Sequence, residues 1–77
     1  MRVVVEVQAY LEQYSPSGRT EFEQELPEGA SVLTLVRALN IPDELTSVII
    51  VNNTNAGYDH PLHEGDRVIL IPPLAGG

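Results

Sequence analysis

The sequence of 77 residues contains no cysteine and no lysine. Without cysteine, the chain cannot form a disulfide, a thiolate metal site or a cysteine nucleophile. Without lysine, it cannot accept an isopeptide link from a copy of itself. Long apolar runs are also missing: no stretch approaches the roughly 18 apolar residues of a membrane span, and the first strand-like segment turns polar by Glu6. We therefore expect a cytoplasmic protein that does not contact a membrane.

Positive charge is scarce as well. Four arginines oppose eleven acidic residues, which gives a net charge of −7. Nucleic acid is a poor partner for such a surface, because phosphate contacts supply much of that affinity. A basic protein partner fits better, although an acidic surface that only keeps the protein soluble would have the same composition. A domain of this size buries only about 60% of its unfolded surface, so we expect a carrier or binding role without a catalytic site of its own.

Two segments near the N-terminus alternate between apolar and polar residues. Val3 to Leu11 has the period of two that predicts a half-buried strand. The sequence Ser15-Pro16-Ser17-Gly18 favours a type I turn, so the next segment is expected to fold back antiparallel. Thr20 to Leu26 then alternates again, with glutamates at every second position. We predict a β-hairpin whose second strand lies at the edge of a sheet, where the glutamates face solvent.

One helix is predicted in the middle of the chain. Ser31 is placed to cap its N-terminus, and Pro42 prevents it from extending much past Asn40. The apolar side chains recur at the helical spacing i, i+3, i+4 and i+7, at Val32, Leu35, Val36 and Leu39. One amphipathic helix laid across a sheet gives a two-layer α+β domain.

Two further strands are predicted after the helix. The uninterrupted apolar run from Val48 to Val51 indicates a central strand covered on both faces. Residues 52–57 have the composition of a turn. A tight turn at Gly65 then leads into a final strand that ends at Ile71.

His60 and His63 are the only candidates for a metal site in the sequence. Their spacing would place them on one face only in a helix, and Pro61 between them favours a loop. Loop histidines on an acidic surface are the simpler interpretation, so we predict no metal site. The glycines match neither the phosphate-binding nor the dinucleotide-binding pattern, and no hydroxyl, histidine and acid arrangement points to nucleophilic catalysis.

The sequence ends in PPLAGG, which we expect to form a flexible tail, residues 72–77, of a single domain that spans residues 1–77. The two prolines cannot donate hydrogen bonds to a sheet, so the last strand ends before them. The terminal carboxylate has no side chain near it and could enter a narrow channel, although a frayed terminus and a strand end packed against the core are alternatives. The six residues of this tail are Pro72, Pro73, Leu74, Ala75, Gly76 and Gly77.

Three features together resemble a known family. They are the hairpin followed by a helix and further strands, the segment DHPLHEGDR at residues 59–67, and the PPLAGG ending. The sequence is similar to the MoaD/ThiS family of ubiquitin-like sulfur carriers, and within it more to the small subunits of molybdopterin synthase than to the thiamine carriers. This resemblance implies the β-grasp fold, an α+β domain with a mixed sheet of four to five strands packed on one main helix.

The resemblance also implies a function for the tail. An adenylating enzyme of the MoeB/ThiF type would use ATP to activate the carboxylate of Gly77, and a sulfur donor would convert it to a thiocarboxylate. The rest of the tail would contact that enzyme and a MoaE-like large subunit or another sulfur acceptor. The chain itself would bind no cofactor. Carriers for thiamine, tRNA thiolation or cysteine synthesis, and a protein modifier conjugated through Gly77, are alternatives with the same fold.

Overall fold

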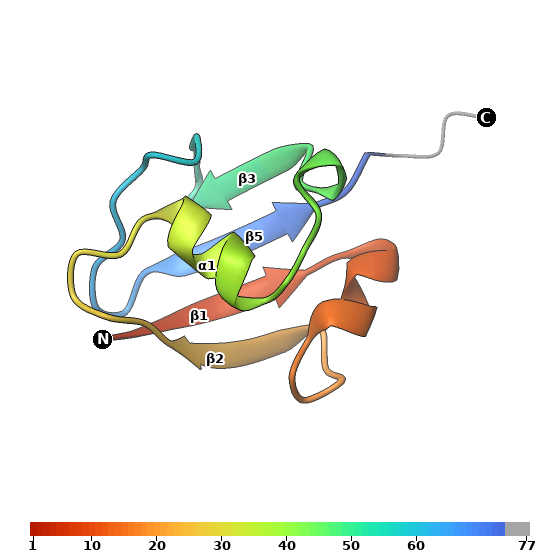
Figure 1. The fold of residues 1–77 in the computed structure, drawn as a ribbon, viewed down its shortest axis with the longest axis horizontal. Coiled ribbons are helices and arrows are strands. Elements are labelled where there is room, and N and C mark those ends of the chain that lie inside the picture. Colours follow the sequence, from red (N-terminus) through yellow and green to blue (C-terminus); the bar gives the residue numbers. More distant parts are fainter. Residues whose placement is uncertain (74–77) are drawn as a thin grey trace.

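Five strands form one mixed sheet, and a single α-helix crosses one face of it (Figure 1). The structure is a computed structural model that describes residues 1–73. The sheet order is β2-β1-β5-β3-β4, which confirms the predicted α+β class. The strands are β1 (Arg2–Val7), β2 (Glu21–Glu25), β3 (Val48–Val51), β4 (Thr54–Asn55) and β5 (Arg67–Ile71). The helices are α1 (Val32–Ala38) and two short 3-10 helices, η1 (Ala9–Tyr14) and η2 (Asp43–Leu45).

The strand pairing places the first and the last strand side by side in the middle of the sheet. β1 and β2 form the predicted antiparallel hairpin. β1 also pairs in parallel with β5, and Val7 lies opposite Leu70. β5 in turn pairs antiparallel with β3. Because β1 and β5 are parallel, the segment after β1 and the segment after β5 leave the sheet at the same end of these two strands (Figure 1).

β1 ends earlier than the sequence pattern predicts. The predicted strand continues to Leu11, but β1 stops at Val7 and the chain turns at Ala9, whose φ is +52°. Ala9 is the first residue of η1, which directs Leu11 into the core. The alternation of apolar and polar residues therefore continues to Leu11 in the sequence, although β1 ends at Val7. The predicted turn that follows is present, since the Gly18 N–H donates to the carbonyl of Ser15 at 3.2 Å.

The helix α1 lies where it is predicted. The Ser31 N–H donates to the Thr34 hydroxyl at 3.1 Å across the first turn of the helix. The N–H of Val32 donates to the carbonyl of His60, so part of the helix N-terminus is satisfied by the loop before β5. α1 ends at Ala38, and Asn40 with φ +59° turns the chain away before Pro42.

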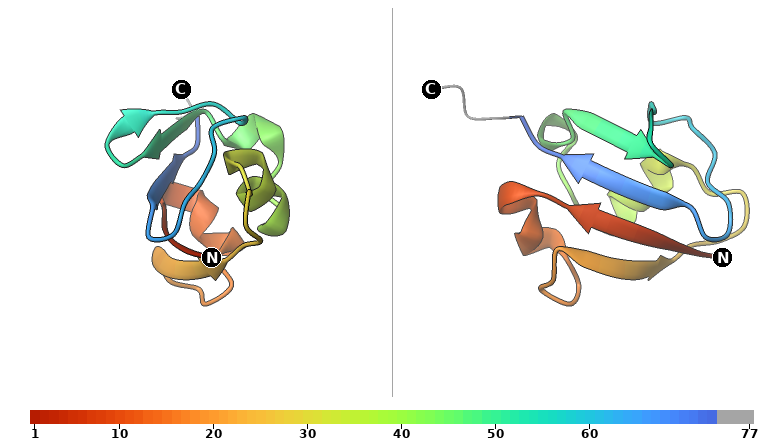
Figure 2. Two further views of the ribbon diagram at one scale, coloured as in Figure 1. Left: turned by 90° about the vertical axis from the view of Figure 1, so that its left-hand side faces the viewer. Right: turned by 180° about the vertical axis from the view of Figure 1, so that it is seen from behind.

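The core lies between α1 and one face of the sheet, and Figure 2 shows the two layers end-on. Alternate residues of β1, β3 and β5 point into it, together with the apolar side of α1. This face of the sheet is lined by Val3, Val5, Val7, Ile49, Val51, Val68 and Leu70, all of them buried. No helix among residues 1–73 is long and apolar enough to cross a membrane.

In the described part of the chain, no helix or strand covers the other face of the sheet, and here a prediction is wrong. Val48 to Val51 was expected to form a strand covered on both faces, but Val48 is 40% exposed and Ile50 is half-buried. The reason is that the domain has one main helix, which covers one face only. β4, which falls inside the predicted turn at residues 52–57, pairs with β3 and forms the edge of the sheet.

Candidate functional site

The base of the tail is held by the end of β5. Ile71 is the last residue of β5, and the two prolines that follow end the ladder as predicted. Pro72 is buried and Pro73 is half-buried, so the chain leaves the domain from a fixed place. The other predicted site residues, Leu74, Ala75, Gly76 and Gly77, lie outside the described residues.

The segment after β1 contacts this base directly. The Gln8 N–H donates to the carbonyl of Leu70 at 3.1 Å. The Tyr10 hydroxyl donates to the carbonyl of Pro73 at 3.1 Å. Sequence reasoning missed Tyr10, because it placed this residue in a strand that the structure ends at Val7. An exposed aromatic residue just beyond a strand was the only signal available.

The uncovered face of the sheet carries an apolar patch next to the tail. Val48 lies opposite Ile71, and Ile50 lies opposite Ile69, so the four side chains form a continuous surface across β3 and β5. We call Val48, Ile50, Ile69 and Ile71 the open-face patch. It merges at Ile71 with the base of the tail. A contiguous apolar area on a surface is typical of a protein interaction site.

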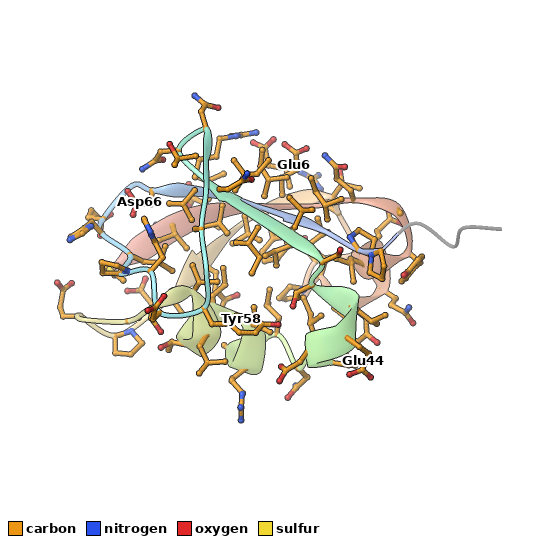
Figure 3. All side chains as sticks on the ribbon, turned by 90° about the horizontal axis from the view of Figure 1, so that it is seen from above. Glu6, Glu44, Tyr58 and Asp66 are labelled. Atoms are coloured by element: carbon orange, nitrogen blue, oxygen red, sulfur yellow. The ribbon has the colours of Figure 1, made fainter. Side chains whose placement is uncertain are left out.

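The same face is charged over β1 and β2. Arg67 Nη2 lies 3.0 Å from a carboxylate oxygen of Glu21 and 3.1 Å from one of Glu6. The hydrogen bond that Arg67 donates to Glu21, followed by the charge of Glu21 and by the hydrogen bond to Glu6, raises the pKa of the Arg67 guanidinium. Figure 3 shows Glu6 on the side of the sheet away from the helices. This half of the face therefore combines an arginine that is paired with two carboxylates and a row of glutamates.

The remaining glutamates of β2 reinforce the acidic edge. Glu23 and Glu25 lie 3.5 Å from the guanidinium of Arg2, and both carboxylates are largely exposed. The prediction that the glutamate row of β2 faces solvent at an edge of the sheet is confirmed. The open face thus has an apolar half beside the tail and an acidic half beyond it.

The structure offers little elsewhere that could perform chemistry. His63 is exposed and its Nδ1 lies 3.9 Å from Asp66, whereas His60 accepts a hydrogen bond at the start of α1 through its backbone carbonyl. Within residues 1–73 there is no group of three or more histidine or acidic side chains that could hold a metal ion. A shallow hollow of about 210 Å³ beside β3 is lined mainly by small side chains and by Tyr58.

Comparison with protein families gives one match over almost the whole chain. The model of the ThiS family matches residues 5–77. Among curated proteins, the molybdopterin synthase sulfur carrier subunit of Escherichia coli (strain K12) is 52% identical over 27 residues, which are 35% of this chain. The matched segment spans only 33% of that relative.

Solved structures of the same fold match over nearly their full length. The protein named "Putative molybdopterin converting factor, subunit 1" from Pyrococcus furiosus is 29% identical, with a TM-score of 0.73 over 95% of this chain and 98% of that one. A protein-protein complex of subunits 1 and 2 of molybdopterin-converting factor from Helicobacter pylori contains a chain that is 23% identical, with a TM-score of 0.61 and full coverage of both chains. These likenesses confirm the predicted β-grasp fold.

Proposed function

The chain belongs to the ThiS family of ubiquitin-like sulfur carriers, and on that premise we propose that it is the small, sulfur-donating subunit of a molybdopterin synthase. The observation that carries the proposal is the PPLAGG ending of a chain that matches the family model, with Pro72 and Pro73 placed directly after β5. The likeness to the curated and solved molybdopterin proteins supports a sulfur-carrier role in general, and it is the reason for choosing this pathway as the one to test first.

The chemistry of the proposal requires only the terminal carboxylate of Gly77. A terminal carboxyl has a reference pKa of about 3.3–3.7, so it is ionised at neutral pH. Its oxygen attacks the α-phosphorus of ATP, and pyrophosphate leaves to give an acyl-adenylate. Hydrosulfide released by the sulfur donor then attacks the carbonyl carbon and AMP leaves, and loss of the remaining S–H proton yields the thiocarboxylate. The adenylating partner supplies the catalytic groups for both steps.

Two partners follow from this sequence of reactions. One is an adenylating enzyme of the MoeB/ThiF type, and the other is a MoaE-like large subunit in which the sulfur is delivered. The Helicobacter pylori complex supports a partner subunit of the second kind. We propose that both bind the open-face patch, because it is apolar, is not covered by any of residues 1–73 and is continuous with the base of the tail at Ile71.

The proposal is tested by intact-mass spectrometry. The purified chain is incubated with ATP, a MoeB/ThiF-type enzyme and a sulfur donor, and a gain of about 16 Da is expected, because one oxygen is exchanged for sulfur. A chain that lacks Gly77 serves as the control and should show no gain. The absence of a gain in the full chain, or an equal gain in the control, would contradict the carrier function.

The acceptor is tested in a second step. The thiocarboxylated chain is mixed with a MoaE-like subunit and a pterin precursor, and the mass should return to that of the carboxylate as sulfur is transferred. Attachment of Gly77 to lysines of other proteins, with no consumption of the pterin precursor, would instead identify a protein modifier.

A further inference from the structure

The turn that follows β1 has an unusual backbone. Ala9 adopts φ +52°, in the left-handed region that residues other than glycine rarely occupy. Such a conformation costs free energy and persists only where the surrounding structure demands it. Here the turn sends Leu11 into the core, where it is fully buried, and leaves the neighbouring Tyr10 at the surface, 44% exposed.

The ring of Tyr10 is largely exposed, but its hydroxyl has a hydrogen-bond partner. The hydroxyl donates to the carbonyl of Pro73 at 3.1 Å, across 63 positions of the sequence. Pro73 has no N–H, so its carbonyl is the only backbone group through which a hydrogen bond can hold it. Ala9 directly precedes Tyr10 in η1, so its strained backbone sets the position of the Tyr10 side chain.

The contact is part of a larger attachment between the two chain segments. The Gln8 N–H donates to the carbonyl of Leu70, and Pro72 between the two contacts is buried. Because β1 and β5 run parallel, the segment after β1 emerges next to the end of β5 (Figure 1). The chain from Leu70 to Pro73 is therefore held by three successive interactions, of which the Tyr10 hydrogen bond is the last.

We propose that Tyr10 is a positioning residue for the reactive C-terminus: its hydroxyl fixes the backbone at Pro73, the last described residue before it. The proposal deepens the carrier function and rests on it. A tail whose starting direction is fixed samples fewer conformations, so a larger fraction of molecules is ready to enter the adenylating enzyme. Loss of the contact lowers this fraction without altering any group that takes part in the reaction.

The kinetic consequence is a change in KM without a change in kcat. In Tyr10→Phe the ring remains and only the hydroxyl is lost. The KM of the adenylating enzyme for this variant should rise about three- to tenfold, the range that corresponds to one net hydrogen bond, while kcat stays the same. Tyr14→Phe is the matched control, since Tyr14 lies in the same 3-10 helix and its hydroxyl has no hydrogen bond within residues 1–73.

A second measurement tests the contact without any partner. The backbone order parameter of the Leu74 N–H, measured by ¹⁵N relaxation, should fall in Tyr10→Phe and stay unchanged in Tyr14→Phe. An unchanged order parameter and an unchanged KM in Tyr10→Phe would overturn the role of Tyr10. If the unmodified chain gives no thiocarboxylate at all, the carrier function fails, and the order parameter still decides whether Tyr10 holds Pro73.

Discussion

Neighbouring residues of β5 serve opposite faces of the sheet. Leu70 is fully buried beneath α1, whereas Ile69 is half-buried in the open-face patch. Because successive side chains of a strand point to opposite faces of the sheet, Leu70 contributes to the core and Ile69 to the proposed docking surface. Substitution of the two residues should therefore separate folding from partner binding.

Leu70→Ala should lower the free energy of unfolding by about 2–5 kcal/mol, because it removes buried methyl groups and leaves a cavity. Ile69→Ala should cost about 1 kcal/mol or less, because its side chain remains partly hydrated in the folded state. Urea denaturation measures both. Ile69→Ala should nevertheless weaken the complex with the adenylating enzyme, as measured by calorimetry. Equal destabilisation by the two variants, or undiminished binding by Ile69→Ala, would contradict this division.

Asp66 is a residue with a structural rather than a chemical role. One of its carboxylate oxygens accepts a hydrogen bond from the Asn52 side chain at 2.9 Å, and the other accepts one from the His63 N–H at 2.8 Å. Its side chain is 14% exposed. The glycine-aspartate pair that contributed to the family resemblance therefore closes the loop before β5, with Gly65 at φ +84°.

Asp66→Ala should lower the free energy of unfolding by about 1–3 kcal/mol, because it removes two hydrogen bonds that each contribute about 0.5–1.5 kcal/mol net. Asp59→Ala is the control for the loss of one negative charge, since Asp59 is exposed in the same loop and accepts no hydrogen bond through its side chain within residues 1–73. Chemical denaturation of both variants checks the prediction. A control that loses as much stability as Asp66→Ala would show that the charge matters rather than the hydrogen bonds.

At the scale of elements, the sequence predicts best where a local signal ends an element. Pro42 and the helical spacing locate α1, and the double proline locates the end of β5. The end of β1 is not predictable in this way, because Leu11 returns to the core through a 3-10 turn and so imitates a continuing strand. The open-face patch is hidden for a related reason: an apolar run such as Val48 to Val51 has the same sequence whether a second layer covers it or not.

The start of β1 is tied to the end of β2 by an ion pair that titrates. The α-amino group of Met1 lies 3.1 Å from a carboxylate oxygen of Glu25 and 3.4 Å from one of Glu28. The hydrogen bond to Glu25 is the main cause that raises the pKa of this amino group, against a smaller opposing effect of desolvation. The same contact lowers the pKa of Glu25.

This raised pKa predicts a loss of stability in alkali. Because the folded protein holds the proton more tightly than the unfolded chain, the contribution is complete below about pH 8 and is lost as pH rises through the folded pKa. The chain has no lysine and no cysteine, so the α-amino group is the main titrating group in the interval that begins at about pH 8. The melting temperature should fall across this interval, and more gently in Glu25→Gln. A fall of equal slope in both proteins would exclude the ion pair as its cause.

At the scale of the whole molecule, the acidic charge and the open-face patch define what can bind. A net charge of −7 opposes association between two copies of the chain, although each presents an uncovered apolar area. A partner with an apolar centre and a basic rim would match both halves of the face. The acidic edge of β2 would meet that rim while the tail enters the partner.

Such a partner should associate at a rate that depends on salt. The association rate constant with the adenylating enzyme should fall roughly tenfold as salt rises from about 0.05 M to about 0.5 M, because screening removes the long-range attraction, whereas the dissociation rate should change little. The double variant Glu21→Gln/Glu23→Gln should associate more slowly and respond less to salt. Asp43→Asn/Glu44→Gln removes the same charge from η2, which lies on the helix side (Figure 3), and should have a smaller effect. Stopped-flow kinetics measure all three proteins. If the two double variants slow association equally, net charge governs the encounter and the acidic half of the open face has no special part in it.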